Sequence, residues 1–130
     1  MVIIDNEYIT LLYHEAEKIV HHQVHRPFSG EPLGAALTRG CEVLEQYGSI
    51  KWLSDERMNG PMSDEDAGWA RNFWNKRVLD AGWKYWALVI SQDLAGSFSM
   101  KAAVDGFSKL GVTVGLYTNP DMAMKWLIKQ

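Results

Sequence analysis

The hydrophobic positions of the chain form strand-like and helix-like segments that alternate from one end to the other. The first two segments, 8–14 and 19–25, are rich in β-branched and aromatic residues, and a short polar turn at 15–18 separates them. Such a pair is typical of an antiparallel hairpin. Because proline has no backbone N–H to donate, Pro27 is expected to end the second strand.

Four helices are predicted after the hairpin, because apolar residues recur there at spacings of three and four. The first lies between a cap at Ser29 and a stop at Gly48, the second between a cap at Ser63 and about Ala81, and the third spans 99–110. The inward-facing positions are Leu33, Ala36, Leu37, Cys41, Leu44 and Tyr47 in the first helix, Ala67, Ala70, Phe73, Trp74 and Val78 in the second, Met100, Ala103, Val104 and Phe107 in the third, and Ala123, Trp126 and Leu127 in the last, which Asn119 caps.

Three further strands, 50–53, 84–90 and 112–117, lie between these helices. The resulting order is β-β-α-β-α-β-α-β-α. Strands that are joined by helices run parallel, with right-handed connections. We therefore predict one α/β domain over residues 1–130, with a mainly parallel five-stranded mixed sheet and an N-terminal antiparallel hairpin.

Composition narrows the class of protein. The chain has 130 residues, 47% of them hydrophobic, and no apolar run approaches the roughly 20 residues that cross a bilayer. A net charge of -3 with interspersed signs argues against a nucleic-acid partner. The N-terminus does not have the pattern of a signal peptide, and a single cysteine, Cys41, leaves no internal disulfide, so a cytoplasmic location is expected. Cys41 is expected to be a buried structural thiol.

Polar side chains follow the third predicted strand, in the run Trp52-Leu53-Ser54-Asp55-Glu56-Arg57. Sites of α/β proteins usually lie at such carboxyl ends. In a structural interpretation, Asp55 accepts backbone hydrogen bonds and Arg57 pairs with a carboxylate, which orders the loop. In a functional one, Arg57 binds an anionic ligand that Ser54 and Asp55 orient. A pocket that includes Trp52, Trp69 and Arg57 would favour a ligand, whereas a flat apolar patch would favour a protein partner.

The order of elements resembles the STAS fold of sulphate transporter and anti-sigma-factor antagonist domains. A closer resemblance, to a group of small bacterial STAS-like proteins, is carried by the segments 52–55 (Trp-Leu-Ser-Asp), 81–87 (Ala-Gly-Trp-Lys-Tyr-Trp-Ala) and 123–127. It covers nearly the whole chain. The resemblance implies the fold but no activity, because that group has no established biochemical function.

The same resemblance points to a serine. Antagonist-type STAS domains are switched by phosphorylation of a serine at the start of the helix after the third strand, and Ser63 takes roughly this place. No Asp-Ser-Ser-Gly context surrounds it, however, and the carboxylates of Asp64, Glu65 and Asp66 would repel a phosphate. A helix cap is therefore favoured over a phosphoacceptor at Ser63.

All four histidines lie on the predicted hairpin. If its turn pairs Tyr13 with Val20, His22 shares the core face, and the other three histidines lie on the opposite face. His21 and His25 would then be about 13 Å apart, too far to hold one metal ion together. No metal or cofactor site is predicted.

Six tryptophans are many for so short a chain. Core packing accounts for most of them, because each large ring buries much apolar area. If Trp83 and Trp86 both belong to the fourth strand, they face opposite sides of the sheet, and one of them is available for a dimer interface or an apolar ligand.

These observations predict a binding protein rather than an enzyme, since no phosphate loop, zinc spacing or nucleophile elbow occurs. The first expectation is a STAS-like regulatory or protein-interaction module that forms a homodimer. The alternative is a binder of a small apolar or anionic ligand at the loop 52–62, with Trp52, Ser54, Asp55, Arg57 and Trp69 as contact residues.

Overall fold

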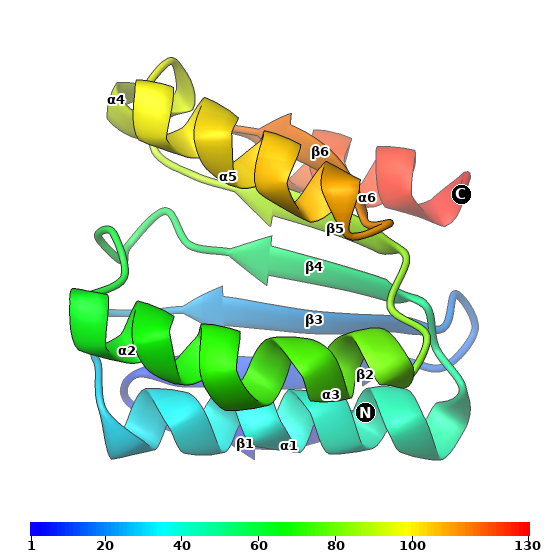
Figure 1. Ribbon diagram of the computed structural model, residues 1–130. Coiled ribbons are helices and arrows are strands. Elements are labelled where there is room, and N and C mark those ends of the chain that lie inside the picture. The colour runs from blue at the N-terminus through cyan, green and yellow to red at the C-terminus, as the bar shows by residue number, and fades with distance from the viewer.

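The computed structural model describes residues 1–130, apart from the side chains of residues 98 and 99. Its sheet has six strands, in the spatial order β1-β2-β3-β4-β5-β6 (Figure 1). The strands are β1 (Val2–Asp5), β2 (Ile9–His14), β3 (Ile19–Val24), β4 (Lys51–Asp55), β5 (Tyr85–Val89) and β6 (Thr113–Tyr117). The helices are α1 (Glu31–Tyr47), α2 (Asp64–Trp69), the π-helical segment η1 (Ala70–Trp74), α3 (Asn75–Asp80), α4 (Gln92–Ala95), α5 (Phe98–Lys109) and α6 (Pro120–Ile128).

The α/β class and the antiparallel N-terminal hairpin are confirmed, whereas the prediction of five strands is wrong. Strand β1 pairs antiparallel with β2, β2 with β3, and the pairs from β3 to β6 are parallel. The sequence pattern missed β1 because it contains only four residues, and its register with β2 shifts between Val2 and Ile4. Four residues are too few to show a period of two.

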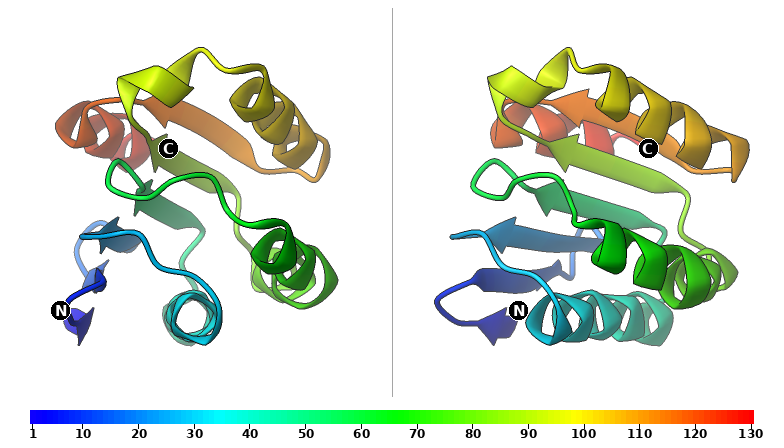
Figure 2. Two further views of the ribbon diagram at one scale, coloured as in Figure 1. Left: turned by 90° about the vertical axis from the view of Figure 1, so that its left-hand side faces the viewer. Right: turned by 60° about the vertical axis from the view of Figure 1, so that its left-hand side comes forward.

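The helices lie on both faces of the sheet in unequal numbers. Each helical connection joins neighbouring parallel strands and proceeds in the same direction along the sheet, so α1, the α2–α3 run and α5 cover one face. Helix α6 follows the last strand and packs against β4, β5 and β6 from the other face (Figure 2). A core that includes Leu11, Val20 and Trp52 therefore lies under α1 and α3, and a smaller one with Leu53 and Val89 lies under α6.

Most predicted helix ends are confirmed. Ser63 caps α2 by accepting the N–H of Asp66 at 3.1 Å, and Asn119 caps α6. Gly48 ends α1 in the left-handed conformation, with φ of 64°. The predicted cap at Ser29 is wrong, because Gly30 takes the cap position before α1 and no side chain caps this end. The backbone N–H of Gly30 donates to the Asp66 carboxylate.

The second predicted helix is interrupted inside by the π-helical segment η1. The wider turn contains one more residue than an α-turn and shifts the register of the side chains that follow. Phe73, which was expected in the core, is consequently 68% exposed, while Trp74 donates its indole N–H to the carbonyl of Leu37 at 2.9 Å. Single π turns of this kind are frequent at functional sites.

Cys41 is fully buried, as expected, and burial raises the pKa of its thiol to about 11. Within the part of the chain that the structure describes, no group of three or more His, Cys, Asp or Glu side chains is placed to hold a metal ion. None of the described helices is both long enough and apolar enough to span a membrane.

Candidate functional site

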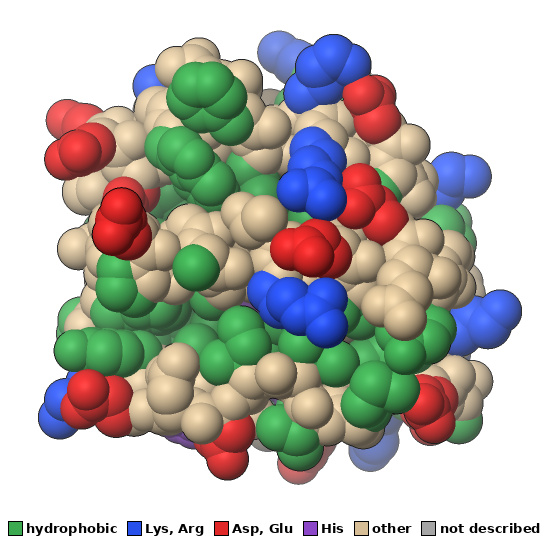
Figure 3. Space-filling model, turned by 90° about the horizontal axis from the view of Figure 1, so that it is seen from below, with side chains coloured by type: hydrophobic (Ala, Val, Ile, Leu, Met, Phe, Trp, Pro, Cys, Tyr) green, Lys and Arg blue, Asp and Glu red, His purple; other side chains and the backbone are tan. Residues whose placement is uncertain are grey.

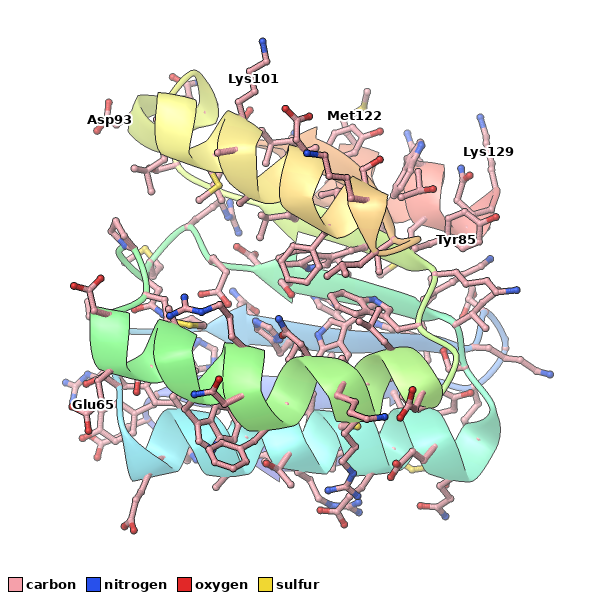
Figure 4. The ribbon with its side chains drawn as sticks, viewed as in Figure 1. Glu65, Tyr85, Asp93, Lys101, Met122 and Lys129 are labelled. Atoms are coloured by element: carbon pink, nitrogen blue, oxygen red, sulfur yellow. The ribbon has the colours of Figure 1, made fainter. Side chains whose placement is uncertain are left out.

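A groove opens between the α2–η1–α3 run and α5, above strands β4 and β5. One hollow of about 410 Å³ lies against η1 and β4, and a second of about 460 Å³ continues toward α1 and α4. They share the lining residues Leu37, Glu56, Met62 and Trp86, so we treat them as one aromatic groove. Figure 4 shows side chains from the sheet and both helices extending into this space. The first hollow is lined by His22, Leu37, Trp52, Ser54, Glu56, Met62, Ala67, Ala70, Arg71, Trp74, Asn75, Trp83, Trp86, Ala103 and Phe107.

The groove has a wall of tryptophans in mutual contact. The rings of Trp52 and Trp74 lie edge to face with centroids 5.5 Å apart, and Trp83 lies 5.3 Å from Trp86. Phe107 of α5 closes the cluster at 5.0 Å from Trp86. Trp83 precedes β5 and does not belong to it, so the condition under which Trp83 and Trp86 would face opposite sides of the sheet is not met. Both rings lie on the face of the sheet that α1, the α2–α3 run and α5 cover.

A chain of hydrogen bonds crosses the floor of the groove. The indole N–H of Trp52 donates to Nδ1 of His22 at 3.0 Å, and Nε2 of His22 lies 2.6 Å from the Glu56 carboxylate. Asn59 donates to the other oxygen of Glu56 at 3.2 Å. Burial pushes the pKa of Glu56 upward, but the electrostatic and hydrogen-bonding interactions with His22, together with the hydrogen bond from Asn59, outweigh it and hold this pKa below its usual range. The groove therefore contains a carboxylate held in its ionised form.

Ser54 lies directly opposite His22 on the neighbouring parallel strand. The pair suggests a hydrolase triad with Glu56, but the hydrogen bonds argue against one. Nδ1 of His22 already accepts from Trp52 and Nε2 faces Glu56, so neither ring nitrogen is placed to take the Ser54 proton. The Ser54 hydroxyl itself accepts the indole N–H of Trp86 at 2.9 Å. His22 and Ser54 thus fix the two tryptophans of the floor.

One wall residue has an unsatisfied donor. Trp83 is 3% exposed, and its Nε1 atom is buried without a hydrogen-bond partner among the described atoms. An unpaired buried N–H costs about 1–3 kcal/mol, and such groups are rare in folded proteins. Trp83 lines the first hollow with its ring, while its Nε1 atom is enclosed by protein.

The residues predicted from the loop 52–62 divide between different surfaces. Trp52 and Ser54 lie on the floor of the groove. Asp55 points to the opposite face of the sheet, where its 5% exposed carboxylate accepts two hydrogen bonds from the Arg57 guanidinium, at 2.9 and 2.8 Å. Trp69 is the last residue of α2, and its ring packs beside Gly34 of α1, outside the groove. Ser63 lies at the rim of the second hollow, as the cap of α2.

Glu56 and His22 are among the groove residues that were missed, and Glu56 had a signal in the sequence. Successive residues of a strand point to opposite faces, so Trp52, Ser54 and Glu56 share one face, and Asp55 and Arg57 share the other. This alternation singles out Glu56 in place of Asp55. His22 was expected at the edge of the core, where it lies with 3% exposure, but its contact with Glu56 depends on the register between β3 and β4.

The other face of the hairpin carries a pair of histidines. Tyr13 pairs with Val20, which confirms the predicted register and places His14 and His21 on the face away from His22. Their rings approach across the strands, with Nε2 of His14 2.9 Å from Nδ1 of His21. Burial, together with the neighbouring rings of His14 and His22, lowers the pKa of His21 to about 4.

Comparisons of the chain with protein-family models, with curated proteins and with solved structures gave no match. The chemistry of the groove is therefore derived from its own residues.

Proposed function

We propose that this protein binds a small, largely apolar molecule in the aromatic groove. The observation that carries the proposal is the groove itself, in which four tryptophans and Phe107 surround a hollow of about 410 Å³. Ligand sites typically measure about 300–1,000 Å³ and combine apolar walls with a few polar groups. Here those polar groups are the Glu56 carboxylate and the Ser54 hydroxyl.

The arrangement of the secondary structure supports a site for a ligand better than an incompletely packed core. The π turn of η1 brings Ala70, Arg71 and Trp74 to the wall of the first hollow. Two of the residues that line the first hollow, Ala67 of α2 and Ala103 of α5, have small side chains. Larger residues at these positions would fill the hollow. The polar floor also holds Trp52 and Trp86 in fixed orientations, and a preorganised site loses less entropy when a ligand binds.

The interaction module with STAS-like topology, the homodimer and the cytoplasmic location stay predictions. In that alternative, the partner would use the edge strand β1, where Val2 is 64% exposed and the backbone is open to pairing. Figure 3, which shows the molecule from below, has a band of hydrophobic side chains beside a cluster of acidic and basic ones on this side. Native mass spectrometry of the protein separates the two functions. A bound small mass supports the groove, and a dimer without added mass supports the module.

A binding assay with a neutral apolar dye, Nile red, tests the groove directly. We expect saturable binding of the dye to the wild-type protein, and its fluorescence emission measures this binding. Ala103→Leu fills the hollow from α5, and overpacking of about 1–3 kcal/mol predicts a loss of affinity of roughly 5- to 150-fold. Ala102→Leu is the matched control, because Ala102 precedes it on the same helix and is exposed. Equal affinities of the two variants, or no saturable binding by the wild type, would refute the proposal.

A further inference from the structure

The aromatic groove contains a carboxylate without a cation. Glu56 follows β4, and its backbone N–H donates to the carbonyl of Val89 at 2.8 Å, which fixes the residue beside β5. Its side chain is 24% exposed and lines both hollows, so it lies where they meet. Any molecule that occupies the groove along its length therefore passes this carboxylate.

The histidine that contacts Glu56 contributes a hydrogen bond but no charge. Nδ1 of His22 accepts the indole N–H of Trp52 and must carry a lone pair, so the single proton of the ring lies on Nε2. That proton is donated to Glu56. Asn59, the second donor, is also neutral. The negative charge of Glu56 is thus solvated by dipoles and is not neutralised.

No lysine or arginine within the described residues supplies the missing charge. The only ion-pair contact of Glu56 within 4.0 Å is with His22. Arg71 lines the first hollow, but it is exposed and forms no ion pair with Glu56. Lys101 of α5 points away from the groove (Figure 4). A carboxylate in such partly desolvated surroundings gains more from a cation than one in water does.

Resting on the proposed function, we infer that the ligand of the aromatic groove is an organic cation, an apolar amine or quaternary ammonium compound whose charged nitrogen pairs with Glu56. The tryptophans support the same charge, because the faces of aromatic rings attract ammonium groups as well as apolar surface. Trp86 lines both hollows together with Glu56, so an ammonium group that pairs with Glu56 lies in a space that this aromatic ring also lines. An anionic ligand would meet the Glu56 charge at the centre of the groove.

Three naphthyl compounds of nearly equal size, tested by calorimetry on the unmodified protein, decide the charge of the ligand. They are 2-(1-naphthyl)ethylamine, which is a cation at pH 7, the neutral 2-(1-naphthyl)ethanol and the anionic 1-naphthylacetate. A hydrogen bond to a charged group contributes roughly 1.5–3 kcal/mol, so the amine should bind about 10- to 150-fold more tightly than the alcohol. Glu56→Gln should remove this preference and leave alcohol binding within about twofold. Glu42→Gln, the matched control, removes one carboxylate charge from the exposed surface of α1, away from both hollows, and should keep the preference.

The outcomes distinguish this inference from the proposal on which it rests. Equal affinity for amine and alcohol would overturn the cationic ligand while leaving the apolar groove intact. Tightest binding of the carboxylate, lost in Arg71→Gln, would overturn it in favour of an anion. Failure of all three compounds and of Nile red to bind would refute the groove itself.

Discussion

Replacement of Gly40 by alanine is the sharpest test of how the floor of the groove is built. A Cβ atom at Gly40, inside α1, would lie 2.4 Å from Cη2 and 2.6 Å from Cζ2 of Trp52. The ring must therefore move by about 1 Å to reach ordinary contact. It has little freedom to move, because it is 1% exposed and bonded to His22, and its edge packs on Trp74.

The expected magnitude follows from two opposing terms. Alanine in place of glycine inside a helix gains about 1 kcal/mol. Overpacking of a rigid core costs about 1–3 kcal/mol, and more where neighbours cannot shift. Because the contact involves the body of a fixed ring, we place the cost at the upper end and expect Gly40→Ala to lower the free energy of unfolding by about 2 kcal/mol.

The control lies on the same helix. A Cβ at Gly34 would meet the ring of Trp69 at 3.6 Å, which is ordinary contact, so Gly34→Ala should raise the free energy of unfolding by about 0.5–1 kcal/mol. Urea denaturation followed by circular dichroism measures both variants, and Nile red binding should weaken only in Gly40→Ala. Equal stability of the two variants would show that Trp52 is not held where the structure places it.

Three further predictions concern residues outside the groove. Arg57→Ala leaves the buried Asp55 carboxylate without its guanidinium partner, so urea denaturation should show a loss of about 1–3 kcal/mol while Nile red affinity is unchanged. A stable variant that no longer binds would restore the anion-binding interpretation of the loop. His21 has a folded-state pKa of about 4 against 6.5 when unfolded, so the unfolded chain takes up the proton first. Stability contributed by neutral His21 should thus be complete above pH 6.5 and fall between pH 6.5 and 4, and His21→Gln should flatten the stability curve in this window. The Cys41 thiol, buried and with its pKa raised to about 11, should react with iodoacetamide only after unfolding, and labelling of the native protein at the rate of free cysteine would contradict its burial.

Local sequence was sufficient wherever the structure depends on neighbours along the chain. The caps at Ser63 and Asn119 and the stop at Gly48 could be predicted, because each depends on bonds within a few residues. The register of the hairpin, with Tyr13 opposite Val20, followed from its short turn. Strand β1 could not be predicted, because four residues form a strand only when β2 supplies its partner.

The groove, in contrast, was decided by tertiary structure. The sequence contained the tryptophans and the alternation that places Trp52, Ser54 and Glu56 on one face of β4. It could not show that α5 packs on β6 and leaves a space beside the α2–η1–α3 run, or that His22 meets Glu56 across the β3–β4 register. Periodicity fixes which face of an element is apolar, but the separation between two helices on a sheet depends on all the side chains beneath them. For this reason, the sequence indicated an aromatic core, and only the fold showed that part of it is open.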